Sequence, residues 1–125
     1  GKILQLHDAK SGETCGYNET YQCVNPARLA VIDIGYADGL HRALSNKGVL
    51  YWNDTPCPIR GRVSMDYIIV EIPDMPEGSP PEIGDHLEWI GRHQGADDIA
   101  AQCGTIGYEI ITGPGNRFQR EYITA

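Results

Sequence analysis

Glycine and proline divide this chain into short segments. Fifteen glycines and eight prolines are spread over 125 residues, and both residue types interrupt regular elements. The segments between them are rich in β-branched and aromatic residues, which favour strands. The pattern predicts strands at Lys2–Leu6, Arg28–Ile34, Val49–Trp52, Tyr67–Ile72, His86–Ile90, Glu109–Thr112 and Phe118–Ile123. The stretch from Pro73 to Pro81 contains four prolines and is expected to be a loop.

Helical signals are few. Asp97 or Asp98 can cap a helix over Ile99–Cys103, and Gly104 can adopt the left-handed conformation that ends it. A further helical turn is possible at Leu40–Leu44. Many short strands with so little helix predict a mainly β fold, an antiparallel β-barrel with one or two short helices. Neither an internal repeat nor a long linker divides the sequence, so residues 1–125 are expected to form a single domain.

The charge balance and the apolar runs exclude several classes of partner. Lys and Arg number 10 against 17 Asp and Glu, and the formal net charge is −7. An acidic chain is a poor binder of nucleic acid or of an anionic membrane. The longest apolar runs are far shorter than a membrane span, and the opening residues do not resemble a signal peptide. We therefore expect a cytoplasmic domain. The sequence opens on Gly1 and not on Met, so we also expect the domain to belong to a longer protein.

The four cysteines show no metal-binding or redox spacing. Cys15, Cys23, Cys57 and Cys103 form no C-x-x-C pair, and none stands at zinc-finger spacing with a histidine. The sequence predicts reduced, structural thiols and no metal site.

Three tyrosines follow glycines, in Gly16-Tyr17, Gly35-Tyr36 and Gly107-Tyr108. A glycine beside an aromatic residue lets the backbone bend and brings the ring to the edge of a loop. Three such pairs make a cluster of exposed phenols plausible, although pattern alone favours a structural role. The segment 61–66 precedes a strong strand, and its backbone N–H groups could bind an anion.

Other arrangements imitate known sites without matching them. The segment 35–39 follows a strand but has neither the ending of a P-loop nor the spacing of a dinucleotide fingerprint. Asp38, His41 and Ser45 could share a helical face like a nucleophilic triad, yet no nucleophile elbow is present. A solvated helix end is the better interpretation.

Read in order, these segments resemble the C-terminal β-domain of alanine racemase, a pyridoxal-phosphate enzyme. The resemblance spans essentially the whole chain, and it is the combination of motifs that makes it specific. The matching pieces are Gly16-Tyr17-x-x-Thr20-Tyr21, Ile34-Gly35-Tyr36-Ala37-Asp38-Gly39, Gly61-Arg62-Val63-Ser64-Met65-Asp66, Gly104-Thr105-Ile106-Gly107-Tyr108-Glu109 and Arg117-Phe118-Gln119-Arg120-Glu121-Tyr122.

The resemblance implies a domain that works only with the rest of its protein. The family has an N-terminal (β/α)₈ barrel that holds pyridoxal 5'-phosphate on a lysine, whereas this chain has only Lys2, Lys10 and Lys47, none in such a setting. The isolated chain is expected to be inactive. The implied function is interconversion of L- and D-alanine by two bases, which supplies D-alanine for peptidoglycan. The alternatives are a racemase of serine, lysine or several amino acids, and a non-catalytic β-barrel interaction module.

The same resemblance implies roles for individual residues. Tyr17 is the expected catalytic base, Met65 would bind the substrate carboxylate through its backbone N–H, and Tyr108 would contact the cofactor phosphate. Because Tyr17 and Tyr108 would serve different active sites, the expected partners are the protein's own barrel and a second subunit of a homodimer. We further expect Tyr17, Tyr36 and Met65 on one rim, and an exposed apolar or aromatic patch where the barrel and the second subunit would pack. The expected entrance residues are Tyr36, Arg42, Arg62 and Ile106. Asn18-Glu19 departs from the family's usual small, Gly-containing pair and Tyr67 is a variable position, and both bear on substrate preference.

Overall fold

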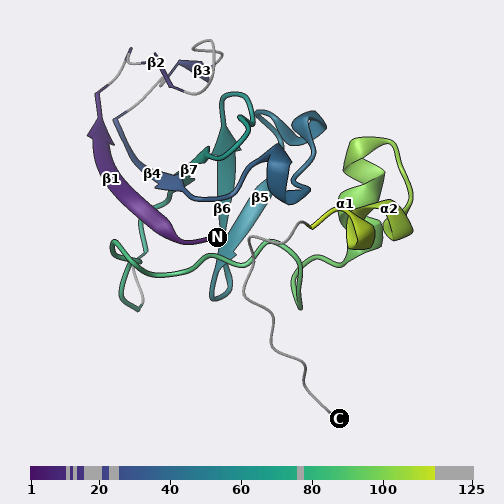
Figure 1. Cartoon of the computed structure of the whole chain (residues 1–125). Helices are drawn as coiled ribbons and strands as arrows, with labels where there is room; N and C mark the ends of the chain where they lie inside the picture. Colours follow the sequence, from purple (N-terminus) through teal and green to yellow (C-terminus); the bar gives the residue numbers. More distant parts are fainter. Residues whose placement is uncertain (11, 13, 16–20, 23–25, 76–77, 115–125) are drawn as a thin grey trace.

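A computed structural model describes residues 1–10, 12, 14–15, 21–22, 26–75 and 78–114. Its strands and helices alternate with short turns (Figure 1). The strands are β1 (Ile3–Ala9), β2 (Thr14–Cys15), β3 (Tyr21–Gln22), β4 (Ala27–Ile32), β5 (Val49–Trp52), β6 (Thr55–Arg60) and β7 (Ile68–Ile72). The helices are the 3₁₀ turns η1 (Tyr36–Asp38) and η2 (Arg42–Leu44), and the α-helices α1 (Ala96–Cys103) and α2 (Gly107–Thr112).

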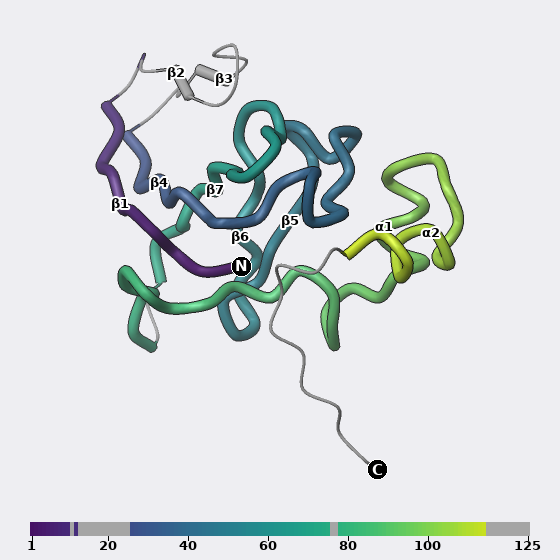
Figure 2. The backbone as a smooth tube through the Cα atoms, in the orientation of Figure 1, coloured from purple at the N-terminus to yellow at the C-terminus, as the bar shows by residue number. Residues whose placement is uncertain are grey.

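Five of the strands form one sheet in the order β1-β4-β7-β6-β5, with every pair antiparallel. β2 and β3 form a separate two-stranded sheet. The mainly antiparallel β fold with short helices is therefore confirmed. Figure 2 shows η1 and η2 in the connection from β4 to β5, and α1 and α2 together at one side of the sheet.

The ladder of the described strands is not closed into a barrel. Its edge strands, β1 and β5, instead bond to the same extended segment, through the bridges Lys2↔His86 and Tyr51↔Glu88. The backbones of Tyr51 and Glu88 exchange two hydrogen bonds of 2.8 Å. The predicted strand His86–Ile90 is thus present only as isolated bridges, because it switches from one edge strand to the other within three residues.

The core lies between the sheet and the helices. Ile68, Val70 and Ile72 alternate inward along β7, the period-2 pattern of a strand with one buried face. Ile99 of α1 and Ile110 of α2 are buried in the same cluster. The helices therefore complete the core that the sheet begins. No helix in the described part of the chain is long and apolar enough to cross a membrane.

Two predicted elements differ from the structure. The predicted strand Glu109–Thr112 is wrong, since these residues belong to α2. β-branched residues favour strands, but here burial of Ile110 against α1 decides the conformation. β6 was not predicted, because its sequence Thr-Pro-Cys-Pro-Ile-Arg contains two prolines. The predicted strand Phe118–Ile123 lies outside the described residues.

The helix at 99–103 is confirmed, with a start that differs in detail. α1 begins one residue after Gly95, and the Asp98 carboxylate accepts a 2.9 Å hydrogen bond from the Gly95 N–H. Gly104 is left-handed with φ of 70° and ends the helix as expected. The helical turn expected at Leu40–Leu44 is present as η2.

Cys57 is expected to be inert in the folded protein. Its side chain is completely buried, and burial raises the pKa of the thiol to about 11. Since the thiolate is the reactive form, a pKa two units higher lowers its fraction at pH 8 about a hundredfold. Alkylation of the native full-length protein with iodoacetamide at pH 8, followed by peptide mass spectrometry, should leave Cys57 at least that much slower than after unfolding. Equal rates before and after unfolding would contradict the buried position.

Candidate functional site

A surface groove of about 390 Å³ brings together residues from two of the motifs. One wall comes from the segment after β4, with Tyr36 and Arg42. The other comes from the loop before β7, with Val63, Ser64, Met65, Asp66 and Tyr67. Tyr36 and Met65, which were expected on one rim, therefore do line one groove.

The first wall is a tight turn built by Gly35 and Asp38. The carboxylate of Asp38 is buried and accepts a 3.1 Å hydrogen bond from the Gly35 N–H. Gly39 follows with φ of 93°, a left-handed conformation suited to glycine, and donates its N–H to the Tyr36 carbonyl. The turn therefore holds Tyr36 at the surface while Leu40 enters the core.

The second wall is attached to the end of η2. The Gly61 N–H donates to the Asn46 side chain, and the Val63 N–H donates 2.9 Å to the Ser45 hydroxyl. That hydroxyl in turn donates 2.6 Å to the carbonyl of Arg42. The loop that ends at Met65 is thereby fixed to the segment that carries Arg42.

Two backbone hydrogen bonds join the walls directly. The Tyr36 N–H donates to the Ser64 carbonyl and the Ala37 N–H donates to the Met65 carbonyl, both at 3.0 Å. The approach depends on Gly35, because a Cβ there would lie 2.3 Å from the Ser64 oxygen and 2.4 Å from the Met65 oxygen. The backbone contact between the two walls therefore defines the groove.

The side chains in the groove are exposed despite their size. The exposed fractions of Tyr36, Met65 and Tyr67 are 42%, 51% and 50%. The Arg42 guanidinium carbon lies 5.7 Å from the centre of the Tyr36 ring, a cation–π distance. Among the described residues, the Met65 N–H finds no hydrogen-bond acceptor and Arg42 no carboxylate. A free N–H and a nearby cation suit a carboxylate ligand.

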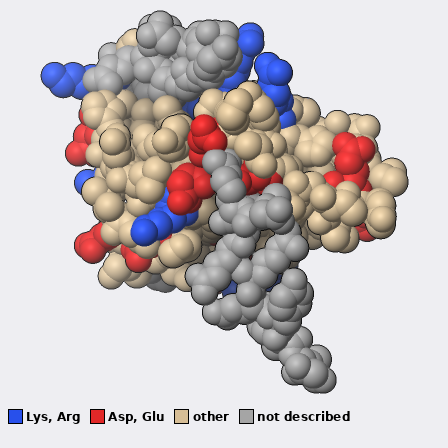
Figure 3. Space-filling view, in the orientation of Figure 1, with Lys and Arg blue, Asp and Glu red and all other residues tan. Residues whose placement is uncertain are grey.

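The outer face of α2 is apolar and exposed. The exposed fractions of Ile106, Tyr108 and Ile111 are 67%, 73% and 65%, whereas Gly107 and Ile110 are buried. On the face seen in Figure 3, acidic side chains are visible on the lobe formed by α1 and α2, whereas Lys and Arg are not. The patch of Ile106, Tyr108 and Ile111, called the α2 patch below, matches the expected apolar or aromatic surface.

α2 is also connected to the first wall. His41, just before η2, lies 3.5 Å from the Glu109 carboxylate of α2. A hollow of about 380 Å³ between the two elements is lined by Tyr36, Gly39, His41, Glu109 and Thr112, with Leu40 and Gly113 completing it. Tyr36 thus stands between the groove and α2.

The predicted site residues fall into four groups. Tyr36, Arg42 and Met65 line the groove, whereas Ile106 and Tyr108 lie on the α2 patch. Arg62 is exposed in the loop just before the groove residue Val63. Tyr17, the predicted catalytic residue, lies outside the described residues, as do Asn18 and Glu19 beside it.

The apparent triad of Asp38, His41 and Ser45 has structural roles. Asp38 caps the Gly35 turn, Ser45 joins η2 to Val63, and His41 faces Glu109. From the sequence, Tyr67 was marked only as a variable position that bears on substrate preference, and no place in the site was assigned to it. Its position directly before the buried start of β7 was the available signal.

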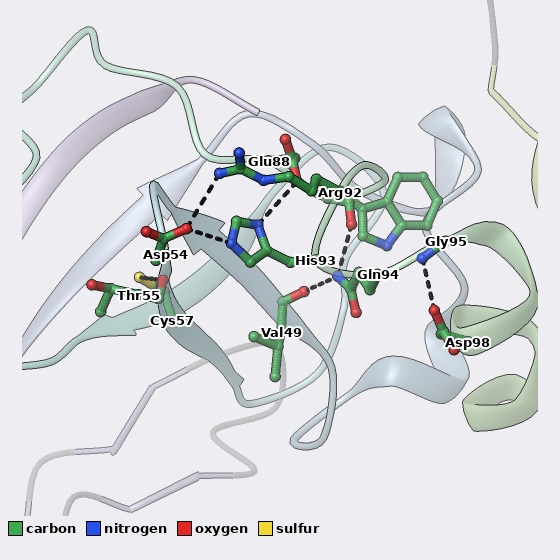
Figure 4. Close-up of polar contacts among 11 residues, drawn as sticks. Val49, Asp54, Thr55, Cys57, Glu88, Arg92, His93, Gln94, Gly95 and Asp98 are labelled. Atoms are coloured by element: carbon green, nitrogen blue, oxygen red, sulfur yellow. Dashed lines mark hydrogen bonds and ion pairs between the residues drawn. The ribbon is translucent and has the colours of Figure 1, made fainter.

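A second polar cluster lies on the loop before α1 and serves the fold (Figure 4). His93 Nε2 is 2.8 Å from Asp54 in the turn between β5 and β6, and its ring stacks on Tyr51 at 4.5 Å. The buried Gln94 side chain donates to the carbonyls of Val49 and Trp89. These contacts attach the loop to β5 and place the start of α1.

Comparison with known proteins identifies the fold. The family model for the alanine racemase C-terminal domain matches residues 1–122. An alanine racemase of Brucella ovis is 48% identical over 122 residues, which are 98% of this chain and 31% of that protein. One from a Jannaschia species is 46% identical over 118 residues, 94% of this chain and 33% of that protein.

Solved structures agree. The alanine racemase of Bartonella henselae, solved with covalently bound pyridoxal phosphate, superposes with a TM-score of 0.91 at 43% identity. The match covers 98% of this chain and 33% of that one. The biosynthetic alanine racemase of Pseudomonas aeruginosa gives 0.86 at 32% identity, over 98% of this chain and 34% of that one.

A mainly antiparallel domain in which the Gly35-Tyr36 turn and the loop before β7 meet in a groove is the class that the fold and the site define. The chain belongs to the alanine racemase C-terminal domain family. It spans about a third of the length of the relatives that it matches.

Proposed function

We propose that the protein to which this chain belongs is a pyridoxal-phosphate-dependent alanine racemase, an isomerase that interconverts L- and D-alanine. The observation that carries the proposal is the groove in which Tyr36, Arg42 and Met65 meet, within a domain of this family. The interaction-module alternative predicts no common meeting point for these motifs. The isolated chain is expected to be inactive, because it would supply only part of each active site.

Met65 would bind the substrate carboxylate through its backbone N–H. The support is that this N–H is not used by another described residue and that Arg42 lines the same groove. A charge-assisted hydrogen bond to a backbone N–H is strong and directional, so it would orient the substrate. Arg42 and Arg62 would attract the carboxylate toward the entrance, although the domain as a whole is acidic.

The residues present fit a minor share of a pyridoxal-phosphate site. The exposed hydroxyl of Tyr108 could donate to a phosphate, whereas the groove is lined by no lysine that could hold the cofactor covalently. The main binding groups would therefore come from the rest of the protein. When bound, the cofactor serves as an electron sink that makes the substrate Cα–H acidic.

Tyr17 would move a proton on one face of the substrate, opposite a lysine of the barrel. A free phenol has a pKa of about 10 and is a weak base at neutral pH. Positive charge nearby must lower that pKa, and the rest of the protein would supply it. Because the chain would serve two different active sites, the working enzyme would be a homodimer. It would act in the cytoplasm, and its D-alanine would be used for peptidoglycan.

The test is α-hydrogen exchange and racemisation by the full-length protein with pyridoxal phosphate in D₂O. L-alanine is expected to gain deuterium and appear as D-alanine, whereas the 125-residue chain alone should do neither. L-serine and L-lysine, supplied separately, test the alternative substrates. Faster turnover of either would replace alanine as the substrate, and exchange with none of the three would favour the interaction module.

A further inference from the structure

The groove contains a large aromatic side chain that the proposed function does not use. Tyr67 lines it together with Met65, and its exposed fraction of 50% is close to the 51% of Met65. In the described part of the chain, neither a hydrogen bond nor a ring contact of the Tyr67 side chain is present. A tyrosine held in this way contributes little to the fold, and its ring is available to whatever enters the groove.

The backbone on both sides of Tyr67 is fixed. Its carbonyl accepts two hydrogen bonds from Ser64, one of 3.2 Å from the N–H and one of 2.7 Å from the hydroxyl. The next residue, Ile68, begins β7 and is 1% exposed. The ring is therefore attached to a closed turn on one side and to a core strand on the other. The backbone at the base of this wall is thus connected to the fold on both sides.

The opposite wall is fixed as well. Tyr36 is bonded through its N–H to Ser64, and Arg42 lies over its ring. Tyr36 and Tyr67 thus line the groove together with Met65. A ligand whose carboxylate binds the Met65 N–H must place the rest of its atoms in the space that these walls leave.

We propose that Tyr67 is a specificity-determining residue that restricts the groove to amino acids with small side chains. The inference rests on the proposed function, since it takes the Met65 N–H as the carboxylate site. Tyr67 and Met65 line the same groove, so a ligand held at the Met65 N–H shares that space with the Tyr67 ring. Removing the ring enlarges the groove. Amino-acid substrates whose side chains are longer than a methyl group should then be accepted better.

The experiment compares alanine with L-2-aminobutyrate, which is one methylene longer, in the full-length protein with pyridoxal phosphate. One methylene changes kcat/KM by about 10- to 200-fold when a pocket discriminates by size. Tyr67→Ala is expected to raise the ratio of kcat/KM for 2-aminobutyrate over alanine by about tenfold or more. Tyr67→Phe, which keeps the ring, should leave the ratio within about twofold of wild type. Ile83→Ala, at an exposed position outside the groove, is the surface control.

A binding measurement separates specificity from the chemical step. Inhibition constants for acetate and butyrate report the space beside the carboxylate site without any bond being broken. Tyr67→Ala is expected to favour butyrate over acetate about tenfold more than wild type does, the discrimination typical of one or two methylenes. Tyr67→Val also removes the ring but places a β-branched residue, which favours strands, before β7. It provides the same comparison if the alanine variant does not fold.

The outcomes distinguish this inference from the proposed function. If the wild type racemises alanine and both ratios are unchanged in Tyr67→Ala or Tyr67→Val, the specificity role is wrong and the proposed function stands. A wild type that does not act on alanine overturns the proposed function and the inference with it. A changed ratio in Tyr67→Phe as well would assign the effect to the hydroxyl and contradict exclusion by size.

Discussion

Replacement of Tyr17 by phenylalanine in the full-length protein is expected to slow alanine racemisation by about 10²- to 10⁴-fold, the usual contribution of one general acid–base group. Phenylalanine keeps the aromatic ring, so the loss reflects the hydroxyl. Racemisation needs a proton removed from one face of the substrate and another delivered to the opposite face. In the proposed mechanism a lysine of the barrel serves one face, so without the Tyr17 hydroxyl the transfer on the other face has no donor.

The hydrogen exchange of each enantiomer makes the test sharper. In D₂O, the enantiomer whose Cα–H faces the lysine should still exchange in Tyr17→Phe, while the other should not. A merely structural loss would slow both equally. Tyr51→Phe is the matched control, because Tyr51 belongs to β5, stacks on His93 and does not line the groove. Equal, wild-type exchange of both enantiomers in Tyr17→Phe would show that another group is the second base.

Much of the sheet could be predicted because its strands follow local rules. β5 occurs at the predicted residues, and β1, β4 and β7 differ only at their ends. Each has buried residues bounded by turn formers. Such a pattern depends only on the residues of the strand itself, so it can be recognised without knowing the neighbouring strands.

β6 escaped prediction because its prolines are tolerated by its particular neighbours. Pro56 and Pro58 pair with β5, whereas β6 meets β7 only at Ile59 and Arg60. Both prolines therefore lie where the strand has a single partner, so their missing N–H groups cost no ladder hydrogen bond on the open side. The sequence shows the two prolines but not where the pairing of β6 with β7 ends.

α2 illustrates the opposite error. Ile110, Ile111 and Thr112 favour a strand, yet the segment packs as a helix on α1. The close approach uses Gly107, where a Cβ would lie 2.0 Å from the Asp97 carboxylate oxygen. This packing is a tertiary contact, which the sequence of residues 107–112 alone does not indicate.

The sequence predicted that Tyr36 and Met65 lie on one rim, but not the backbone contact that joins the two walls of the groove. Resemblance to the family supplied Tyr36, Arg42 and Met65, which the groove does bring together. The distance between the two motifs in sequence gives no indication that their backbones bond directly, at Tyr36 to Ser64 and Ala37 to Met65. Tyr67 becomes visible as a wall only when that contact is known.

That contact makes Gly35→Ala the substitution with the largest expected effect on stability. The added Cβ would lie 2.3 Å from the Ser64 oxygen and 2.4 Å from the Met65 oxygen. Both are backbone atoms of a loop fixed by Ser45 and Tyr67, so neither can retreat as a flexible side chain would. We expect a loss of at least about 3 kcal/mol in the free energy of unfolding, the upper end for overpacking.

Gly95→Ala is the matched control for this substitution. Gly95 also precedes a helix and also donates its N–H to an aspartate three residues on, at 2.9 Å against 3.1 Å for Gly35. Its φ is −86°, and the nearest atom to an added Cβ is a side-chain oxygen of Asp98 at 3.7 Å. Alanine fits there and should change stability by less than about 1 kcal/mol.

Thermal denaturation of the two variants of the full-length protein, with alanine kcat/KM measured beside it, distinguishes the causes. Gly35→Ala should lower the denaturation temperature and the activity together, because the same two hydrogen bonds hold the core turn and the groove walls. Gly95→Ala should lower neither. If Gly35→Ala melts like Gly95→Ala but loses activity, the groove can open without cost to the fold, and the backbone contact serves the site alone. If it retains both stability and activity, the two walls are not in contact, and the groove requires another explanation.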